Sequence, residues 1–252
     1  MRIIARPYEA LQRLVHLTLF VLVASVFLTP IAKAAPAANA QANERLVLAF
    51  GDSLTAGYRL KPAESFPAQL EASLRAGGLK ARVHNAGVSG DTTSGGKSRL
   101  AWVLNGLKAK PDLAILELGA NDMLRGQNPK ITEANLDAML GEFRKRGIPV
   151  VLAGMFASPN LGVRYLDQFN AIYPKLAKKH GATLYPFFMK GVVFNEPLLL
   201  DDGIHPNPRG VGVIVRNMLP TVRAELLKLP PPKPIPTIVP TRAISASTVR
   251  RD

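Results

Sequence analysis

The sequence predicts an α/β protein in which an open, parallel sheet carries helices on both faces. Short apolar runs rich in Val, Ile and Leu alternate with longer amphipathic stretches, and Gly or Pro bounds most of the runs. Buried parallel strands have this composition, and their alternation with helices is typical of an open α/β sheet. The sequence contains no internal repeat that would favour a solenoid.

The first half of the predicted sheet and its helices follows residue 44. The unbroken apolar run "LVLAF" predicts the first strand, and "ARVHN" predicts the second. A helical pattern follows each of them. In chain order we expect a strand at 46–50, a helix at 65–76, a strand at 81–85 and a helix at 93–108.

The second half continues the same alternation, with strands predicted from "LAILEL", "VVLAG" and "ATLYP". The segments "RKRG" and "AKKHG" place basic residues in the last turn of a predicted helix and a glycine just after it, which is a typical helix end. In chain order we expect a strand at 113–118, a helix at 132–146, a strand at 150–154, a helix at 163–180, a strand at 182–186 and a last helix at 208–228.

Both ends of the chain differ in composition from the part between them. Three arginines precede the apolar run "LVHLTLFVLVASVFL", and "AKA" follows as a cleavage site of small residues, so residues 1–34 are predicted to be an export signal. An uncleaved membrane anchor is the alternative, because residues 14–32 lack formal charge. We expect 35–44 to be a flexible spacer, 45–229 the folded domain and 230–252 a disordered, Pro-rich tail.

Composition and charge restrict the classes of function. The chain has no cysteine, which excludes disulfides, a thiolate nucleophile and a Cys-based metal site. The net charge of +14 favours anionic partners, and we expect transient contact with an anionic membrane surface. The basic residues are scattered and no nucleic-acid-binding signature accompanies them, so we expect no nucleic-acid partner.

Ser53 lies in "AFGDSLTAG", directly after the first predicted strand. Gly, Asp and Ser favour turns for backbone reasons alone, so this stretch by itself indicates only a turn. A nucleophilic serine needs a base within hydrogen-bond reach, and the chain has three histidines beyond its apolar N-terminal segment. His205 in "DDGIHPN" is the best candidate, because His180 ends a predicted helix and His84 lies within a predicted strand.

Three further residues would complete an acyl-transfer site. Asp202 precedes His205 by three residues and could hold the imidazole through Nδ1, although it could instead form only an Asx turn. Gly90 and Asn121 could donate N–H groups to a developing oxyanion. Their alternative roles are a positive φ for Gly90 and a helix cap for Asn121. We expect these loop residues to meet at the edge of the sheet where open α/β proteins bind ligands.

Four segments together, "FGDSLTAG", "NAGVSGDTT", "GANDML" and "DDGIHPN", resemble in order and spacing the four sequence blocks of the GDSL, or SGNH, hydrolases. The resemblance covers roughly residues 45–228 and is greatest to the branch of bacterial exported acyl-CoA thioesterases, lysophospholipases and arylesterases. It implies a flavodoxin-like, three-layer α/β/α fold with five parallel strands in the order 2-1-3-4-5. It also implies that no metal or organic cofactor is needed.

The same resemblance implies the roles of the site residues. It makes Ser53 the nucleophile, His205 the base and Asp202 the partner of that base. It also implies an oxyanion hole formed by the Ser53 N–H together with Gly90 and Asn121. Asp201 does not match the catalytic position.

A loop that shifts on substrate binding in this branch matches "NDMLRGQNP". The resemblance therefore implies a substrate-binding loop at Asp122, Met123, Leu124 and Arg125. Many members carry a glycine where this chain has Met123, and ordinary packing is the alternative role for that methionine.

These observations predict a monomeric serine esterase that hydrolyses small-molecule or lipid esters, including thioesters, through an acyl-enzyme on Ser53. The expected location is the periplasm or the outside of the cell, or the inner membrane if the signal is not cleaved. Two other functions stay open. The family fold also serves carbohydrate O-acetylesterases, and fold alone does not exclude a non-catalytic exported binding protein.

Overall fold

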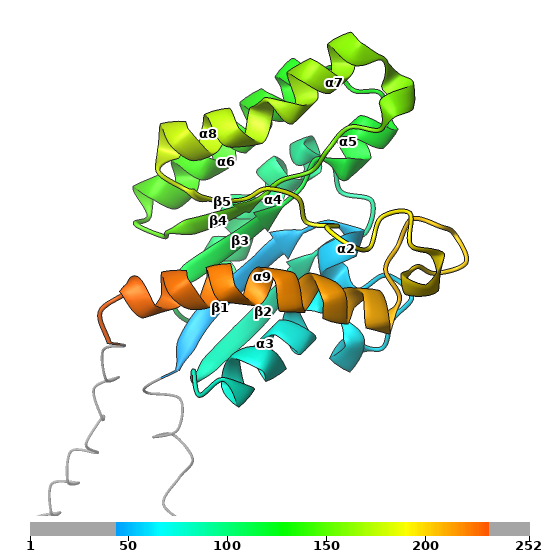
Figure 1. Cartoon of the computed structure of the whole chain (residues 1–252). Helices are drawn as coiled ribbons and strands as arrows, with labels where there is room; N and C mark the ends of the chain where they lie inside the picture. Colours follow the sequence, from blue (N-terminus) through cyan, green and yellow to red (C-terminus); the bar gives the residue numbers. More distant parts are fainter. Residues whose placement is uncertain (1–43, 232–252) are drawn as a thin grey trace, which may run out of the picture. The chain divides into compact units, whose positions relative to one another are not determined.

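The structure, a computed structural model, describes residues 44–231 (Figure 1). Residues 1–43 lie outside the described residues; they hold the predicted export signal and all of the predicted spacer except residue 44. The tail beyond residue 231 also lies outside them. Within the described range, none of the helices has both the length and the apolar character needed to cross a membrane.

All five strands form one parallel sheet in the order β2-β1-β3-β4-β5. This confirms the predicted fold class and strand order. The three inner strands β1, β3 and β4 are buried along their whole length, which explains their apolar sequences; the charged exceptions are Arg45 at the start of β1 and Glu117 at the end of β3. The strands are β1 (Arg45–Gly51), β2 (Ala81–Gly87), β3 (Leu113–Glu117), β4 (Val150–Ala153) and β5 (Thr183–Tyr185).

Helices cover both faces of this sheet (Figure 1). Those of the described residues are α2 (Ser53–Ala56), α3 (Phe66–Ala76), α4 (Thr93–Gly106), α5 (Ala120–Leu124), α6 (Pro129–Lys145), α7 (Val163–Asn170), α8 (Ile172–His180) and α9 (Pro208–Lys228). Short 3-10 turns lie at Pro62–Glu64, Pro159–Leu161 and Glu196–Leu198. α3 and α9 pack against each other on one face, whereas α4, α6 and α8 lie in a row on the other.

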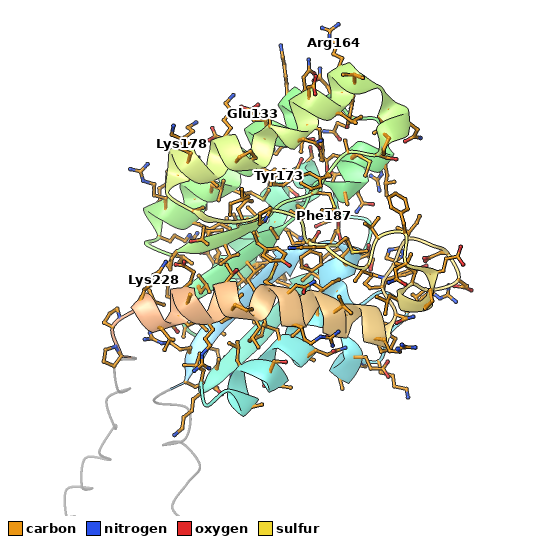
Figure 2. All side chains as sticks on the ribbon, in the orientation of Figure 1. Glu133, Arg164, Tyr173, Lys178, Phe187 and Lys228 are labelled. Atoms are coloured by element: carbon orange, nitrogen blue, oxygen red, sulfur yellow. The ribbon has the colours of Figure 1, made fainter. Side chains whose placement is uncertain are left out.

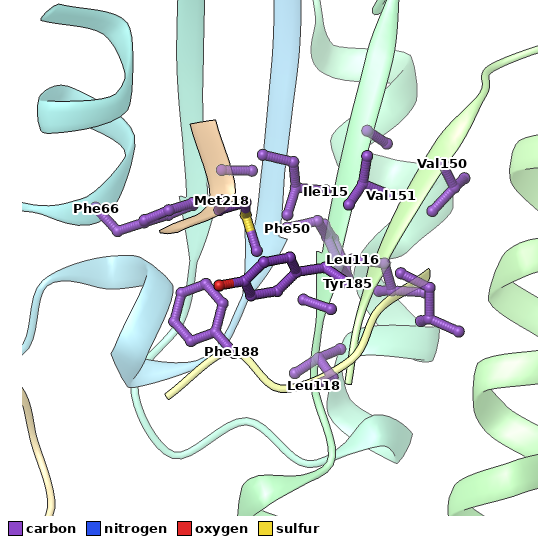
Figure 3. Packing of buried hydrophobic residues seen from close by; sticks show 14 of the residues in the cluster. Phe50, Phe66, Ile115, Leu116, Leu118, Val150, Val151, Tyr185, Phe188 and Met218 are labelled. Carbon is purple, nitrogen blue, oxygen red and sulfur yellow. The ribbon is translucent and has the colours of Figure 1, made fainter. Parts of the chain in front are cut away.

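The core lies between the sheet and these two helix layers. Figure 3 shows Phe50 and Leu116 from the inner strands packed among side chains from α9 and from the segment after β5. Phe66 of α3 meets Phe188 edge-on, with ring centroids 5.0 Å apart. Burying an aromatic side chain of this size contributes about 2–3 kcal/mol. The segment after β5 is therefore anchored in the core before it reaches the rim of the sheet.

The outer helices are amphipathic, as their sequences predict. On α8, Tyr173 points inward and is buried, whereas Lys178 points away from the sheet (Figure 2). The Tyr173 hydroxyl donates a hydrogen bond of 2.9 Å to the Leu118 carbonyl just after β3. This bond ties the α8 layer to the loop that follows β3.

The single helix predicted at 163–180 is interrupted at Ala171, between α7 and α8. Pro174 explains the interruption, because it lacks an N–H that could donate to the carbonyl of residue 170, and its ring crowds that carbonyl.

The structure also contains the short helices α2 and α5 where the sequence predicted only loops. Both follow inner strands, and both carry residues of the candidate site.

Candidate active site

Ser53 opens α2 in a sharp turn after β1. Asp52 caps this helix, its carboxylate accepting a hydrogen bond of 2.9 Å from the Leu54 N–H. Gly51 is required here, because a Cβ at this position would lie 2.1 Å from Thr55 Oγ1 and 2.6 Å from the Glu117 carbonyl oxygen. The turn therefore directs Ser53 to the carboxyl edge of the sheet.

His205 joins Ser53 to Asp202. Its Nε2 lies 2.9 Å from Ser53 Oγ, and its Nδ1 lies 2.8 Å from Asp202 Oδ2. The other Asp202 oxygen accepts hydrogen bonds of 2.9 Å from the backbone N–H groups of Ile204 and His205. Both roles considered for Asp202 are thus present, since one oxygen forms an Asx turn while the other contacts the imidazole.

The electrostatics of Asp202 favour its charged form. Partial burial opposes ionisation, but the hydrogen bonds from the His205 and Ile204 N–H groups and from the imidazole outweigh it. Together they lower the pKa of Asp202 to about 2. The charged Asp202 orients the imidazole and stabilises it when it carries a second proton.

Tyr58 is a neighbour of His205 that sequence reasoning did not identify. The ring centroids of Tyr58 and His205 lie 4.4 Å apart, with the planes tilted by 38°. The aromatic ring therefore packs against the imidazole and limits its rotation. No motif in the sequence points to this contact.

The described residues contain two other histidines, and neither reaches this site. His180 ends α8, as predicted, where its Nε2 lies 2.6 Å from Asp137 Oδ1 of α6 and its side chain is largely buried. His84 lies exposed on the edge strand β2. Of the histidines in residues 44–231, only His205 contacts Ser53.

The candidate oxyanion donors are the N–H groups of Ser53, Gly90 and Asn121. The backbone N–H groups of Ser53 and Gly90 have no acceptor among the described residues. Gly90 has a φ of +82°, so its glycine identity is also a backbone requirement. Asn121 Nδ2 donates to Asp52 Oδ2 at 3.1 Å and to the Asp91 carbonyl at 2.9 Å, which places Asn121 between the Ser53 turn and the segment that contains Gly90.

A cavity of about 510 Å³ opens beside Ser53, Asn121 and His205. Its volume lies within the range of small-molecule sites, about 300–1,000 Å³. Most of the wall is apolar. The side chains that make it so include Met123, Leu124, Met155, Phe156, Phe187 and Phe194. The cavity can therefore hold the apolar chain of a ligand, with the polar group of that ligand next to Ser53.

The four residues of the predicted substrate-binding loop have different surroundings. Met123 and Leu124 line the cavity. Asp122 is buried, where its carboxylate accepts hydrogen bonds from Thr93 and Thr132 and ties α5 to α4 and α6. Arg125 donates to the Gly90 carbonyl at 2.9 Å. Only the two apolar members of the loop therefore form part of the cavity wall.

Over residues 44–231, no group of three or more His, Asp or Glu side chains could hold a metal ion. The polar groups that line the cavity include the Ser53 hydroxyl, the His205 imidazole and the Asn121 amide.

The family model described as "GDSL-like Lipase/Acylhydrolase family" matches residues 49–213. The chain belongs to the GDSL-like lipase/acylhydrolase family. As a member, it is a serine hydrolase that acts on ester bonds. The match spans the Ser53 turn, the Gly90 and Asn121 segments and the loop of His205.

Named relatives of the GDSL-like family cover most of the described residues. The chain is 43% identical over 171 residues to an arylesterase from Vibrio mimicus, covering 68% of this chain and 84% of the relative. It is 40% identical over 161 residues to the "Thioesterase 1/protease 1/lysophospholipase L1" of Escherichia coli K12, covering 64% and 75%. It also resembles the crystal structure of AlinE4, an SGNH-hydrolase family esterase, at 49% identity and a TM-score of 0.62, covering 73% and 97%.

Proposed function

We propose that this GDSL-family hydrolase cleaves carboxylic esters and thioesters of apolar acyl groups through an acyl-enzyme on Ser53. The continuous contact from Asp202 through His205 to Ser53 Oγ, beside an apolar cavity, carries this proposal. In acyl transfer this arrangement activates a serine that is otherwise a weak nucleophile.

The first half-reaction follows from the distances. As Ser53 Oγ bonds to the substrate carbonyl carbon, its proton passes to His205 Nε2, 2.9 Å away. The carbonyl oxygen becomes an oxyanion that the N–H groups of Ser53, Gly90 and Asn121 would stabilise. The tetrahedral intermediate then expels the alcohol or thiol, which takes the proton from His205.

The second half-reaction releases the acyl group. His205 accepts a proton from water as the water oxygen bonds to the acyl carbon. Collapse of the second tetrahedral intermediate breaks the bond to Ser53 Oγ, which recovers the proton from His205. The products are a carboxylic acid and the free enzyme.

The apolar wall favours acyl chains over the small acetyl groups of carbohydrates. Aromatic and Met side chains face the cavity next to Ser53, and an acetyl group would leave most of this surface unfilled. The names of the arylesterase and thioesterase relatives support the same substrate classes. A carbohydrate O-acetylesterase and a non-catalytic binding protein are therefore the weaker alternatives.

Replacing Ser53 by Ala tests the proposal. Hydrolysis of short p-nitrophenyl esters should fall to background and labelling by a fluorophosphonate should disappear, because the variant lacks the nucleophilic oxygen. Ser98→Ala is the matched control, since Ser98 is exposed on α4 and only bonds to the Gly95 carbonyl. Undiminished hydrolysis by Ser53→Ala would show that another group carries the reaction.

We further propose that the protein is exported to the periplasm or beyond, and works there as a monomer at anionic membrane surfaces. The signal-like residues 1–34 and the net charge of +14 support export and attraction to such surfaces. Exposed apolar side chains at the cavity mouth, Leu124, Phe194 and Ile204, would contact lipid. Equal binding to neutral and anionic vesicles at low salt would contradict the membrane part, and light scattering of the purified protein tests the oligomeric state.

A further inference from the structure

Two buried carboxyl groups lie next to the nucleophile and take no part in the proton relay. Asp52 precedes Ser53, Glu117 ends β3, and both are completely buried. Gly51 and Glu117 are register partners on adjacent strands, which brings the Glu117 side chain against the Ser53 turn. Burying two like-charged groups together is costly, so one of them must carry a proton.

The hydrogen bonds around the pair are unequal. Asp52 Oδ1 accepts from the Leu54 N–H at 2.9 Å, and Asp52 Oδ2 accepts from Asn121 Nδ2 at 3.1 Å. Glu117 Oε2 accepts from Thr55 Oγ1 at 2.8 Å and, more weakly, from the Asp52 N–H at 3.4 Å. Glu117 Oε1 has no hydrogen-bond partner among the described residues. A negative charge is therefore better stabilised on Asp52 than on Glu117.

The pKa shifts of Asp52 and Glu117 agree with this placement of the charge on Asp52. Burial, together with the neighbouring Asp52, raises the pKa of Glu117 well above its usual value. Burial raises the pKa of Asp52 to about 6, because the hydrogen bonds from Leu54 and Asn121 oppose it only in part. At neutral pH the pair thus holds one proton, on Glu117, and one charge, on Asp52.

Other titratable or charged groups face the pair from each packed element. They are His205 from the loop before α9, Tyr173 from α8, Asp122 from α5, Asp91 from the turn before α4 and Arg99 from the middle of α4. Arg99 donates to the Gly51 carbonyl at 3.0 Å and pairs with Asp91. Of these groups, His205 alone acts in the relay.

Asn121 is the group that connects the carboxyl pair to the reaction. Its amide donates one N–H to the Asp52 carboxylate and the other to the Asp91 carbonyl, so both partners fix the plane of the amide. Hydrogen bonds to a carboxylate are stronger than those to a neutral carboxyl group. Both N–H groups of Asn121 are thus engaged: the charge on Asp52 holds the first, and the oxyanion would share the second with the Asp91 carbonyl.

We propose that Glu117 is a positioning residue: it stays protonated and keeps the single negative charge of the pair on Asp52, which orients Asn121 for the oxyanion. This inference rests on the proposed role of Asn121 in ester hydrolysis. Glu117 acts through its neighbours and does not touch the substrate.

A pair of variants at Glu117 tests this role. Glu117→Met fills a similar volume but offers no acceptor to Thr55 and no polar neighbour to Asp52. We expect kcat to fall about tenfold with little change in KM, because transition-state stabilisation is lost while the cavity stays intact. Glu117→Gln is neutral and can still accept from Thr55, so it should recover most of kcat. Equal kcat values for Glu117→Met and the wild type would overturn the proposal.

A double-mutant cycle with Asn121→Ala separates positioning from general loss of structure. If Glu117 acts through Asn121, then Glu117→Met should have little further effect on kcat in the Asn121→Ala background. Additive losses would mean that Glu117 supports the site by another route and would reject the inference. Hydrolysis that persists in Ser53→Ala would instead reject the proposed function, so the two failures are distinguishable.

Infrared spectroscopy observes the protonated carboxyl group directly. It does not require that the Glu117→Met variant folds. The wild type at pH 7 should show the carbonyl stretch of a protonated, buried carboxyl group, and the difference spectrum against Glu117→Gln should assign it to Glu117. The band should persist as the pH is raised above the usual pKa of a glutamic acid, because burial and Asp52 raise the pKa of Glu117. Absence of the band at pH 7 would show that Glu117 is ionised and would overturn the proposal.

Discussion

His205 Nε2 lies 2.9 Å from Ser53 Oγ, although 152 positions separate the two residues in the sequence. The loop that carries His205 is closed by its own hydrogen bonds. Leu200 donates its N–H to the His205 carbonyl at 2.7 Å, and Asn207 Nδ2 donates to the Leu199 carbonyl at 3.0 Å. The position of the base therefore depends on the closure of this loop as well as on the contact with Asp202.

The two oxygens of Asp202 have different roles. Asp202→Asn should therefore remove the charge beside the imidazole and retain the Asx turn. An Asn side chain can still accept from the Ile204 N–H and keep the Asx turn, but it provides no charge to the imidazole. We expect kcat to fall by about 10³–10⁴-fold while Tm stays near that of the wild type. Asp202→Ala should lower both kcat and Tm.

Asp201→Asn is the matched control for this prediction. Asp201 lies next to Asp202 but pairs with Arg59 at an exposed position. Exposed ion pairs contribute little, so activity should change by less than about twofold. Comparable losses from Asp201→Asn and Asp202→Asn would mean that the loop tolerates no substitution, and the separation of roles would be wrong.

Phe156 should influence the preference for acyl-chain length. Its ring stacks on Phe187 with centroids 4.8 Å apart, and both rings line the cavity near Ser53. Phe156→Ala removes apolar contact that only longer chains would reach, so kcat/KM for octanoyl esters should fall about tenfold relative to acetyl esters. The measurement is a series of p-nitrophenyl esters of increasing chain length. Trp102→Ala on α4 is the control, because Trp102 is exposed and lies outside the cavity lining.

A uniform decrease across the ester series would contradict this prediction. It would show that Phe156 supports the geometry around Ser53 and not the binding of the chain. The distinction matters because Phe156 is about half exposed at the cavity mouth, where it could contact either substrate or solvent.

The fold could be predicted from the sequence because its main signals are local. All five strands appear within one or two residues of the predicted apolar runs, since the buried strands of a parallel sheet are apolar on both faces. The break between α7 and α8 was missed because the helical periodicity continues through it, although Pro174 was visible in the sequence. The helices α2 and α5 are too short for periodicity to reveal.

The site could be predicted in part. The choice of His205 followed from the scarcity of histidines and from the topology, which places separate loops at one edge of the sheet. Tyr58 and Glu117 could not be predicted in the same way. Tyr58 contacts His205 only through the tertiary structure, and Glu117 stands at the end of an apolar strand, where nothing local distinguishes it from an exposed carboxylate.

Gly51→Ala should prevent correct folding of the Ser53 turn. The added Cβ would meet Thr55 Oγ1 and also the Glu117 carbonyl oxygen, which belongs to the backbone of β3 and cannot rotate away. We expect a loss of stability of about 3 kcal/mol or more, measured by urea unfolding. Gly78→Ala is the comparison, since that glycine has a φ of +81° but open space around it, and it should cost about 1 kcal/mol. Similar losses for both variants would show that the turn can adjust.

Glu117→Gln should stabilise the protein increasingly as pH rises. Burial and Asp52 raise the pKa of Glu117 in the folded state above its unfolded value, so the folded state binds the extra proton. The contribution of Glu117 to wild-type stability therefore falls as pH rises above about 4.5, by up to about 1.4 kcal/mol per pH unit, until the folded pKa is reached. The Gln variant lacks this loss, so urea unfolding at pH 4.5, 6 and 7.5 should show a widening advantage. Glu225→Gln should instead be less stable than the wild type by a nearly constant amount above about pH 4.5. Although burial opposes ionisation, Lys228 and Thr183 lower the pKa of Glu225, so its contribution is lost only as the pH falls below that value. A constant difference between wild type and Glu117→Gln would mean that Glu117 ionises as readily in the folded state as in the unfolded chain.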